Sequence, residues 1–134
     1  MASIQPRPHQ MQAVIAEVPQ GVPVVMLNML RFRETAAYPD ERPAVSGRQA
    51  YAKYSAVAVK IVEKVGGRLV WFGQAMGSVI GPPDEDWDHI FLVRYPSIET
   101  FMEMIRSAAY RDIVVHRSAA LADSRLIATV ERET

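Results

Sequence analysis

Three histidines and a few arginines are the side chains of this chain best suited to acid/base chemistry. His89 opens an apolar run, and His116 stands next to Arg117 in a later segment. Imidazole exchanges protons near neutral pH, and a tyrosine hydroxyl can donate a proton. We therefore predict His89, His116 and Tyr54 as candidate catalytic groups. The alternative is that each histidine is a hydrogen-bonded structural residue and that Tyr54 belongs to the core.

An amide, three arginines and an indole form the candidate substrate-binding set. These residues are Asn28, Arg31, Arg94, Arg117 and Trp71. A guanidinium holds a carboxylate or an enolate oxygen through two hydrogen bonds, which suits a small carboxylate or ketone. Asn28 interrupts an apolar strand, where an unpaired amide would cost roughly 1–3 kcal/mol, so it either bonds neighbouring backbone or water, or lines a ligand pocket. Arg117 could instead pair with Asp112 or Asp123, or bond carbonyl groups at a helix end.

Charge and composition exclude several classes of function. Fifteen basic residues balance fifteen acidic ones, so no global field draws the chain to nucleic acid or to an anionic membrane. There is no cysteine, which rules out disulfides and thiolate chemistry. The acidic residues at 84–88 beside His89 match no metal-ligand spacing and are typical of a solvated turn. We expect no metal and no cofactor, since phosphate-binding glycine patterns are absent too.

The first residues of the chain predict an arm outside the main domain. Residues 1–21 are expected to form an N-terminal arm or a short helix that begins after Pro8 and ends at Pro19; the alternative is a flexible arm that orders only on a partner subunit. Residues 22–134 then form one domain, which is long enough to bury a core. We expect a soluble, cytoplasmic protein, because residues 1–20 lack the apolar run of a signal peptide and no stretch of roughly 18 apolar residues exists.

The segment from Trp87 to Arg106 predicts a central strand that runs directly into a packed helix. Asp88–Val93 is apolar with little alternation, as expected for a strand buried on both faces. Apolar residues then follow at helical spacing from Ser97 to Arg106. Val22–Arg31 has the same two-sided apolar character and predicts a second central strand.

A long surface loop, residues 32–45, leads to the first long helix. Ser46 opens this helix, and Gln49 completes the capping-box spacing three residues later. An apolar stripe runs along the helix until Gly66 and Gly67 end it. Tyr51 and Tyr54 lie on the buried side of that stripe, either as core residues or as hydroxyls presented to a pocket.

Two further strands complete the set. Arg68–Ile80 predicts a strand with bends or bulges at Gly73 and Gly77, joined to the central strand through a hairpin turn at Pro82–Asp86. One or two short helices follow the second helix. Arg125–Arg132, which is rich in large and β-branched residues, predicts the last strand.

This order of elements predicts an α+β, ferredoxin-like βαββαβ fold. Right-handed crossovers place the first and third strands at the centre of a four-stranded antiparallel sheet, with two helices on one face. The other face still carries large apolar residues and needs cover. A second copy of the chain is the simplest cover, so we expect a homodimer in which two sheets pack face to face as a dimeric α/β barrel.

Several short motifs support this fold by their order and spacing. They are Tyr51-x-x-Tyr54, Gly66-Gly67-Arg68, Ile80-Gly81, Tyr95-Pro96-Ser97, Ala109-Tyr110 and Arg117. Over about residues 22–132 they resemble the domain-of-unknown-function family 1330. The resemblance implies the dimeric α/β-barrel superfamily, which includes cofactor-free monooxygenases and isomerases, but it implies no established activity. Arg94 stands where that family often has an acidic residue, so no role of that carboxylate carries over.

Two functions are compatible with these residues. The first is a cofactor-independent enzyme that acts on a small carboxylate or ketone, with a histidine or tyrosine as acid/base and an arginine as anion clamp. The second is a non-catalytic dimeric module that binds a small hydrophobic ligand or a protein partner, since the chain has seven methionines and methionine adapts to varied ligands. Convergence of the polar candidates in one closed pocket would favour the enzyme.

Overall fold

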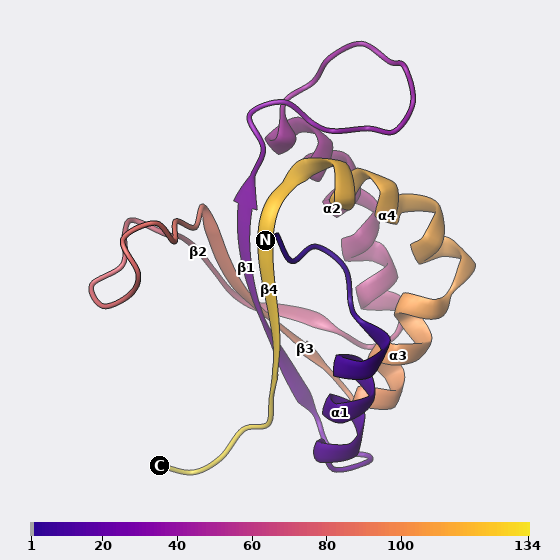
Figure 1. Ribbon diagram of the computed structural model, residues 1–134. Coiled ribbons are helices and arrows are strands. Elements are labelled where there is room, and N and C mark those ends of the chain that lie inside the picture. The colour runs from indigo at the N-terminus through magenta and orange to yellow at the C-terminus, as the bar shows by residue number, and fades with distance from the viewer. Residues whose placement is uncertain (1) are drawn as a thin grey trace.

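The computed structural model, which describes residues 2–134, contains a four-stranded antiparallel sheet and four helices (Figure 1). The strands are β1 (Val24–Phe32), β2 (Arg68–Gln74), β3 (His89–Tyr95) and β4 (Leu121–Thr129). The helices are α1 (Pro8–Glu17), α2 (Gly47–Lys64), α3 (Ile98–Arg106) and α4 (Ala108–Ala120). The strand order is β2-β3-β1-β4, which confirms the ferredoxin-like topology and the central place of the first and third strands.

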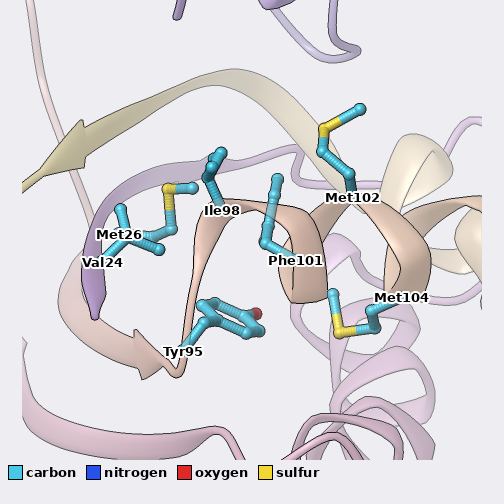
Figure 2. Close-up of a cluster of buried hydrophobic side chains, with 7 residues drawn as sticks. All are labelled: Val24, Met26, Tyr95, Ile98, Phe101, Met102 and Met104. Atoms are coloured by element: carbon cyan, nitrogen blue, oxygen red, sulfur yellow. The ribbon is translucent and has the colours of Figure 1, made fainter. Parts of the chain in front are cut away.

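The core lies between the sheet and the helices, all of which occupy one side of the sheet (Figure 1). Val24 and Tyr95 from the central strands meet Ile98 and Phe101 from α3, together with three methionines (Figure 2). The rings of Tyr95 and Phe101 pack edge to face with their centroids 5.0 Å apart. A second cluster, around Leu30, joins β1 to α2, α4 and β4. These contacts fix the helices over the sheet and thereby position the loops at the end of β1.

Helix α2 begins at a capping box, as its sequence predicts. The Ser46 hydroxyl accepts from the Gln49 amide at 3.0 Å, and the Gln49 side chain accepts from the Ser46 amide at 2.8 Å. Two amides that have no partner inside the helix are thereby satisfied. The cap also orients the first turn of α2, in which Gly47 and Arg48 lie.

Substitution of Ser46 by alanine is expected to lower the free energy of unfolding by about 1 kcal/mol, because the hydroxyl that accepts from the backbone is lost. Chemical denaturation measures this change. Ser55→Ala is the matched control, since Ser55 lies mid-helix and exposed, and its hydroxyl donates only a long bond of 3.5 Å to the Ala52 carbonyl of the same helix. Equal losses from the two variants would show that the cap does not contribute.

Several details of the strands differ from the sequence prediction. Strand β2 ends at Gln74 and not at Ile80, because its partner β3 begins at His89 and the pairing stops there. Its bulge falls between Leu69 and Trp71 and not at a glycine. Strand β4 begins at Leu121 and not at Arg125, because α4 passes directly into a residue that pairs with the end of β1. The segment after α3 is one helix of 13 residues.

The sheet has a helix-free face that carries apolar side chains. Strand alternation and register place Leu27, Leu92, Trp71 and Ile127 together on this face. Trp71 is 54% and Ile127 48% exposed. The predicted shortage of cover on this face is therefore present in the structure.

The N-terminal segment contains the helix α1 and, before it, residues that bond to their own chain. The Ser3 amide donates to Asp123 at 2.9 Å, and Gln5 donates to Ser118 at 3.2 Å. Met11 in α1 and Val18 at its C-cap pack against the core cluster around Ile98. No helix within residues 2–134 is long and apolar enough to cross a membrane.

Candidate functional site

His89, the first residue of β3, lies on the helix side of the sheet next to a guanidinium. Its Nε2 is 3.5 Å from Nη1 of Arg48, in the first turn of α2. A guanidinium only donates hydrogen bonds, so a hydrogen bond between these two nitrogens requires Nε2 to accept, which assigns the neutral tautomer with the proton on Nδ1. The ring therefore presents a basic lone pair beside a fixed positive charge.

Asp88 holds this arrangement in place. One carboxylate oxygen accepts from the Phe32 amide at 2.8 Å, and the other accepts from Arg48 Nη2 at 3.1 Å. The Asp88 amide in turn donates to the Leu30 carbonyl at 2.8 Å. The end of β1 thus fixes Asp88, and Asp88 fixes Arg48. Since Arg48 is more than half exposed, this tether matters more for its position than for stability.

Aromatic rings surround His89 and its arginine. The ring centroids of Phe32 and Phe72 lie 5.0 and 4.9 Å from that of His89, both edge to face. The guanidinium carbon of Arg48 lies 4.9 Å above the Phe32 ring. Phe72 is 52% exposed, so part of this aromatic surface faces solvent. We call His89, Arg48, Asp88, Phe32 and Phe72 the His89 site.

The pKa of His89 is lowered below its ordinary value of 6.5, first by burial and then by the charge of Arg48, which outweigh the opposite effect of Asp88. The ring is therefore neutral at pH 7, as a general base must be.

A tyrosine cluster adjoins the His89 site through Phe32. The Phe32 and Tyr51 rings lie 5.4 Å apart, and Tyr51 lies 5.2 Å from Tyr54. The Tyr54 hydroxyl bonds to the Tyr110 hydroxyl at 2.9 Å. Burial, and then the neighbouring Tyr110, raise the pKa of Tyr54. Tyr54 therefore stays protonated and can donate a hydrogen bond, but it is unsuited to act as a base.

The comparisons with known proteins identify the family. The family described as Domain of unknown function (DUF1330) matches residues 41–130. The chain belongs to this family. This confirms the resemblance to the family that the sequence motifs indicated.

A solved relative agrees with this assignment. The crystal structure of a protein of unknown function from Rhodopseudomonas palustris shares 42% identity over 100% of both chains, with a TM-score of 0.91. No curated protein matches the chain.

Two more distant structures share the fold alone. A hydroxynitrile lyase from Passiflora edulis is 10% identical, covers 85% of this chain and 97% of its own, and has a TM-score of 0.57. SnoaB, a cofactor-independent oxygenase from Streptomyces nogalater, is 11% identical, with coverages of 84% and 96% and a TM-score of 0.54. The DUF1330 chain therefore has the architecture of these enzymes. A shared fold does not determine the chemistry, which depends on the residues of the site itself.

The sheet separates the predicted site residues of this DUF1330 chain into two groups. His89 and Asn28 lie on the helix side, whereas Arg31, Arg94 and Trp71 lie on the helix-free face. These three side chains therefore do not converge with His89. Asn28 Nδ2 donates to the Met26 carbonyl at 3.2 Å, which is the backbone alternative considered for it.

Arg31 has a further disadvantage as a carboxylate clamp. It lines a surface depression together with Arg125 and four carboxylates, those of Asp84, Glu85, Asp86 and Asp123. Because the acidic groups outnumber the basic ones here, an anionic substrate would be repelled. The depression lies away from His89, and so does an apolar groove between α1 and α3.

His116 and Arg117 lie on α4 and have other partners. His116 Nδ1 bonds to the Tyr38 hydroxyl at 2.6 Å, and burial followed by the charges of Lys53 and Arg42 lowers its pKa. Arg117 Nη1 donates to the Ile4 carbonyl at 2.6 Å. Neither Asp112 nor Asp123 pairs with Arg117 in the described chain. His116 and His89 have no contact partner in common.

Sequence reasoning missed Arg48, Phe32 and Phe72 as members of the site, and it treated Asp88 as part of an acidic turn and as the start of a strand, not as a site residue. Arg48 could have been found from its position two residues after the N-cap Ser46, because the first turn of a helix lies beside the loop that precedes it. Among residues 2–134, no three histidine or carboxylate side chains are grouped to hold a metal ion.

Proposed function

We propose that this member of the family is an enzyme without a bound cofactor that moves a proton at a carbon next to a ketone or carboxylate. His89 is the general base and Arg48 the anion clamp. The observation that carries the proposal is the position of His89 Nε2, 3.5 Å from a guanidinium that Asp88 tethers. This is the enzyme hypothesis drawn from the sequence, with a different arginine in the clamping role.

The proposed reaction follows from these positions. A substrate carbonyl that accepts from Arg48 draws the guanidinium away from the imidazole, which frees the Nε2 lone pair. Nε2 then takes the proton from the adjacent carbon, and the C–H electron pair moves into the carbonyl to give an enolate. Arg48 stabilises the oxygen anion as the charge develops. Return of the proton from Nε2, to the same carbon or to another atom, completes an exchange or an isomerisation.

The surrounding rings favour a substrate with an aromatic or bulky apolar group. Phe32 and Phe72 present ring faces and edges within contact distance of His89. Stacking on such rings contributes binding energy without adding charge. An arylpyruvate combines this apolar group with the ketone and the carboxylate that Arg48 would hold.

Proton exchange in heavy water tests the proposal directly. Phenylpyruvate is the probe, and NMR follows replacement of its methylene protons by deuterium. The full chain is expected to accelerate the exchange above the buffer rate, and Arg48→Gln is expected to lose most of this acceleration. Equal rates with and without protein, for phenylpyruvate and for a panel of aliphatic 2-oxo acids, would refute the assignment.

The pH dependence of the same exchange follows from the pKa of His89. The neutral ring is the active form, so kcat/KM should be constant near neutral pH and fall in acid with a midpoint below 6.5, the ordinary value, because burial and Arg48 lower the pKa of His89. Arg48→Gln removes a positive charge and should move the acid limb upward. An acid limb above pH 7 in the unmodified protein would contradict this account.

We also infer that two copies of the chain pair through the helix-free sheet face. The support is physical: Leu27, Leu92, Trp71 and Ile127 place apolar area on a face that no helix covers. The cytoplasmic location and the absence of cofactor, nucleic-acid and membrane partners stay predictions.

A further inference from the structure

The loop between β2 and β3, residues 75–88, exposes large apolar side chains at its tip. Met76 is 89%, Val79 99% and Ile80 96% exposed. A single exposed apolar residue is ordinary, but three on one short segment indicate a surface that contacts something other than water. We call these three residues the loop tip.

The loop projects toward the helix-free side of the sheet. In Figure 1 the helices lie on one side of β1 and β4, and the loop extends on the opposite side. Trp71 and Ile127 expose their apolar side chains on that same helix-free face. The loop tip and the uncovered face are therefore both available to a molecule that approaches from this side.

The base of the loop is anchored to the sheet, so that the tip is held away from it. Arg125 on β4 lies 3.6 Å from the Glu85 carboxylate, and its guanidinium carbon lies 5.0 Å above the Trp87 ring. Glu85 also closes a turn with Pro82, through an amide-to-carbonyl bond of 3.2 Å. These contacts fix residues 82–87 and leave the tip without contacts to its own chain that would bury it.

We propose that this loop is a docking arm for a second copy of the chain, whose helix-free face receives the loop tip. The arrangement is reciprocal, as a two-fold dimer requires, so that each copy gives one arm and receives one. This inference rests on the dimer proposed above and adds to it the segment that completes the interface.

Charge favours a second copy over an anionic lipid surface as the occupant. Asp84, Glu85 and Asp86 follow the loop tip within six residues, and carboxylates are repelled by anionic headgroups. The chain as a whole has no net charge, so two copies approach without long-range repulsion. The receiving face is apolar, which matches the tip.

Measurement of the dimer dissociation constant tests whether the loop is a docking arm. Sedimentation of a dilution series is expected to show that the double variant Val79→Ser, Ile80→Ser raises this constant roughly 10- to 100-fold. The matched control is Val57→Ser, Val59→Ser, because these valines are 42% and 46% exposed but lie on α2, on the helix side. The control should leave the constant within about 2-fold.

Two outcomes would overturn the inference, and they can be told apart. An unchanged dissociation constant in the loop variant would show that the loop is not part of the interface, without contradicting the dimer itself. If the unmodified chain were monomeric at micromolar concentration, both the docking arm and the dimer would be excluded.

A labelled loop tip gives a second readout. Ile80→Cys, in a chain that has no other cysteine, carries an environment-sensitive fluorophore whose emission should move to the blue as protein concentration rises. A blue shift only on addition of phosphatidylcholine vesicles would mean that lipid, and not a second copy, is the occupant.

Discussion

Replacing His89 with glutamine is expected to slow deuterium exchange into phenylpyruvate by roughly 1000-fold, the typical contribution of a general base. Glutamine keeps the size and hydrogen-bonding capacity of the ring but has no basic lone pair near neutral pH. The loss should fall on kcat and not on KM, because Arg48 and the rings of Phe32 and Phe72 still bind the probe. Initial rates from NMR at several probe concentrations measure both.

Two other histidine variants make this result specific. His9→Gln, on the exposed helix α1, should leave the exchange rate unchanged. His116→Gln breaks the bond to Tyr38 but lies outside the His89 site, so it should cost far less than His89→Gln. If His116→Gln abolished exchange and His89→Gln did not, the base would lie on α4 and the site would be wrongly placed.

Gly47→Ala is expected to reduce the free energy of unfolding by about 3 kcal/mol, at the upper end of what overpacking costs. A Cβ at Gly47 would lie 2.2 Å from the Arg33 carbonyl oxygen and 2.6 Å from that of Ala120. Both atoms are backbone, and they are fixed by hydrogen bonds among Gly47, Arg33 and Ala120 where β1, α2 and α4 meet. Neither can move aside without separating these elements.

The same substitution should also reduce exchange activity, because Arg48 is the next residue and would shift with the start of α2. Urea denaturation measures the stability change. Gly21→Ala is the control: Gly21 has a φ of +73° and no atom within 4 Å of the added carbon, so it should cost only the backbone strain of roughly 1–2 kcal/mol. A smaller loss at Gly47 than at Gly21 would mean that the junction is not tightly packed.

The topology followed from the sequence because its signals are local. The capping box at Ser46, the glycines after α2 and the two strands apolar on both faces each depend on neighbouring residues. The loop tip shows the limit of such signals. Met76, Val79 and Ile80 resemble a strand in composition, and only the lack of a pairing partner excludes them from β2.

The site was predicted only in part, because it joins residues distant in the chain. His89 was identified from its residue type, but its partners Arg48 and Phe32 lie 41 and 57 positions away and are brought in by the folding of α2 and β1. The sequence alone could have shown that Arg94 and His89 face opposite sides of the sheet. The two lie five residues apart on one strand, an odd number, so they must face opposite sides.

Histidine side-chain NMR, with phenylpyruvate added to the full chain, tests the central claim most directly. The chain has three histidines, so a single substitution at each assigns all the ring signals. The ring signals of His89 are expected to shift in proportion to occupancy, while those of His9 and His116 stay in place. Shifts at His116 alone, or no shifts with any arylpyruvate or aliphatic 2-oxo acid, would contradict the account.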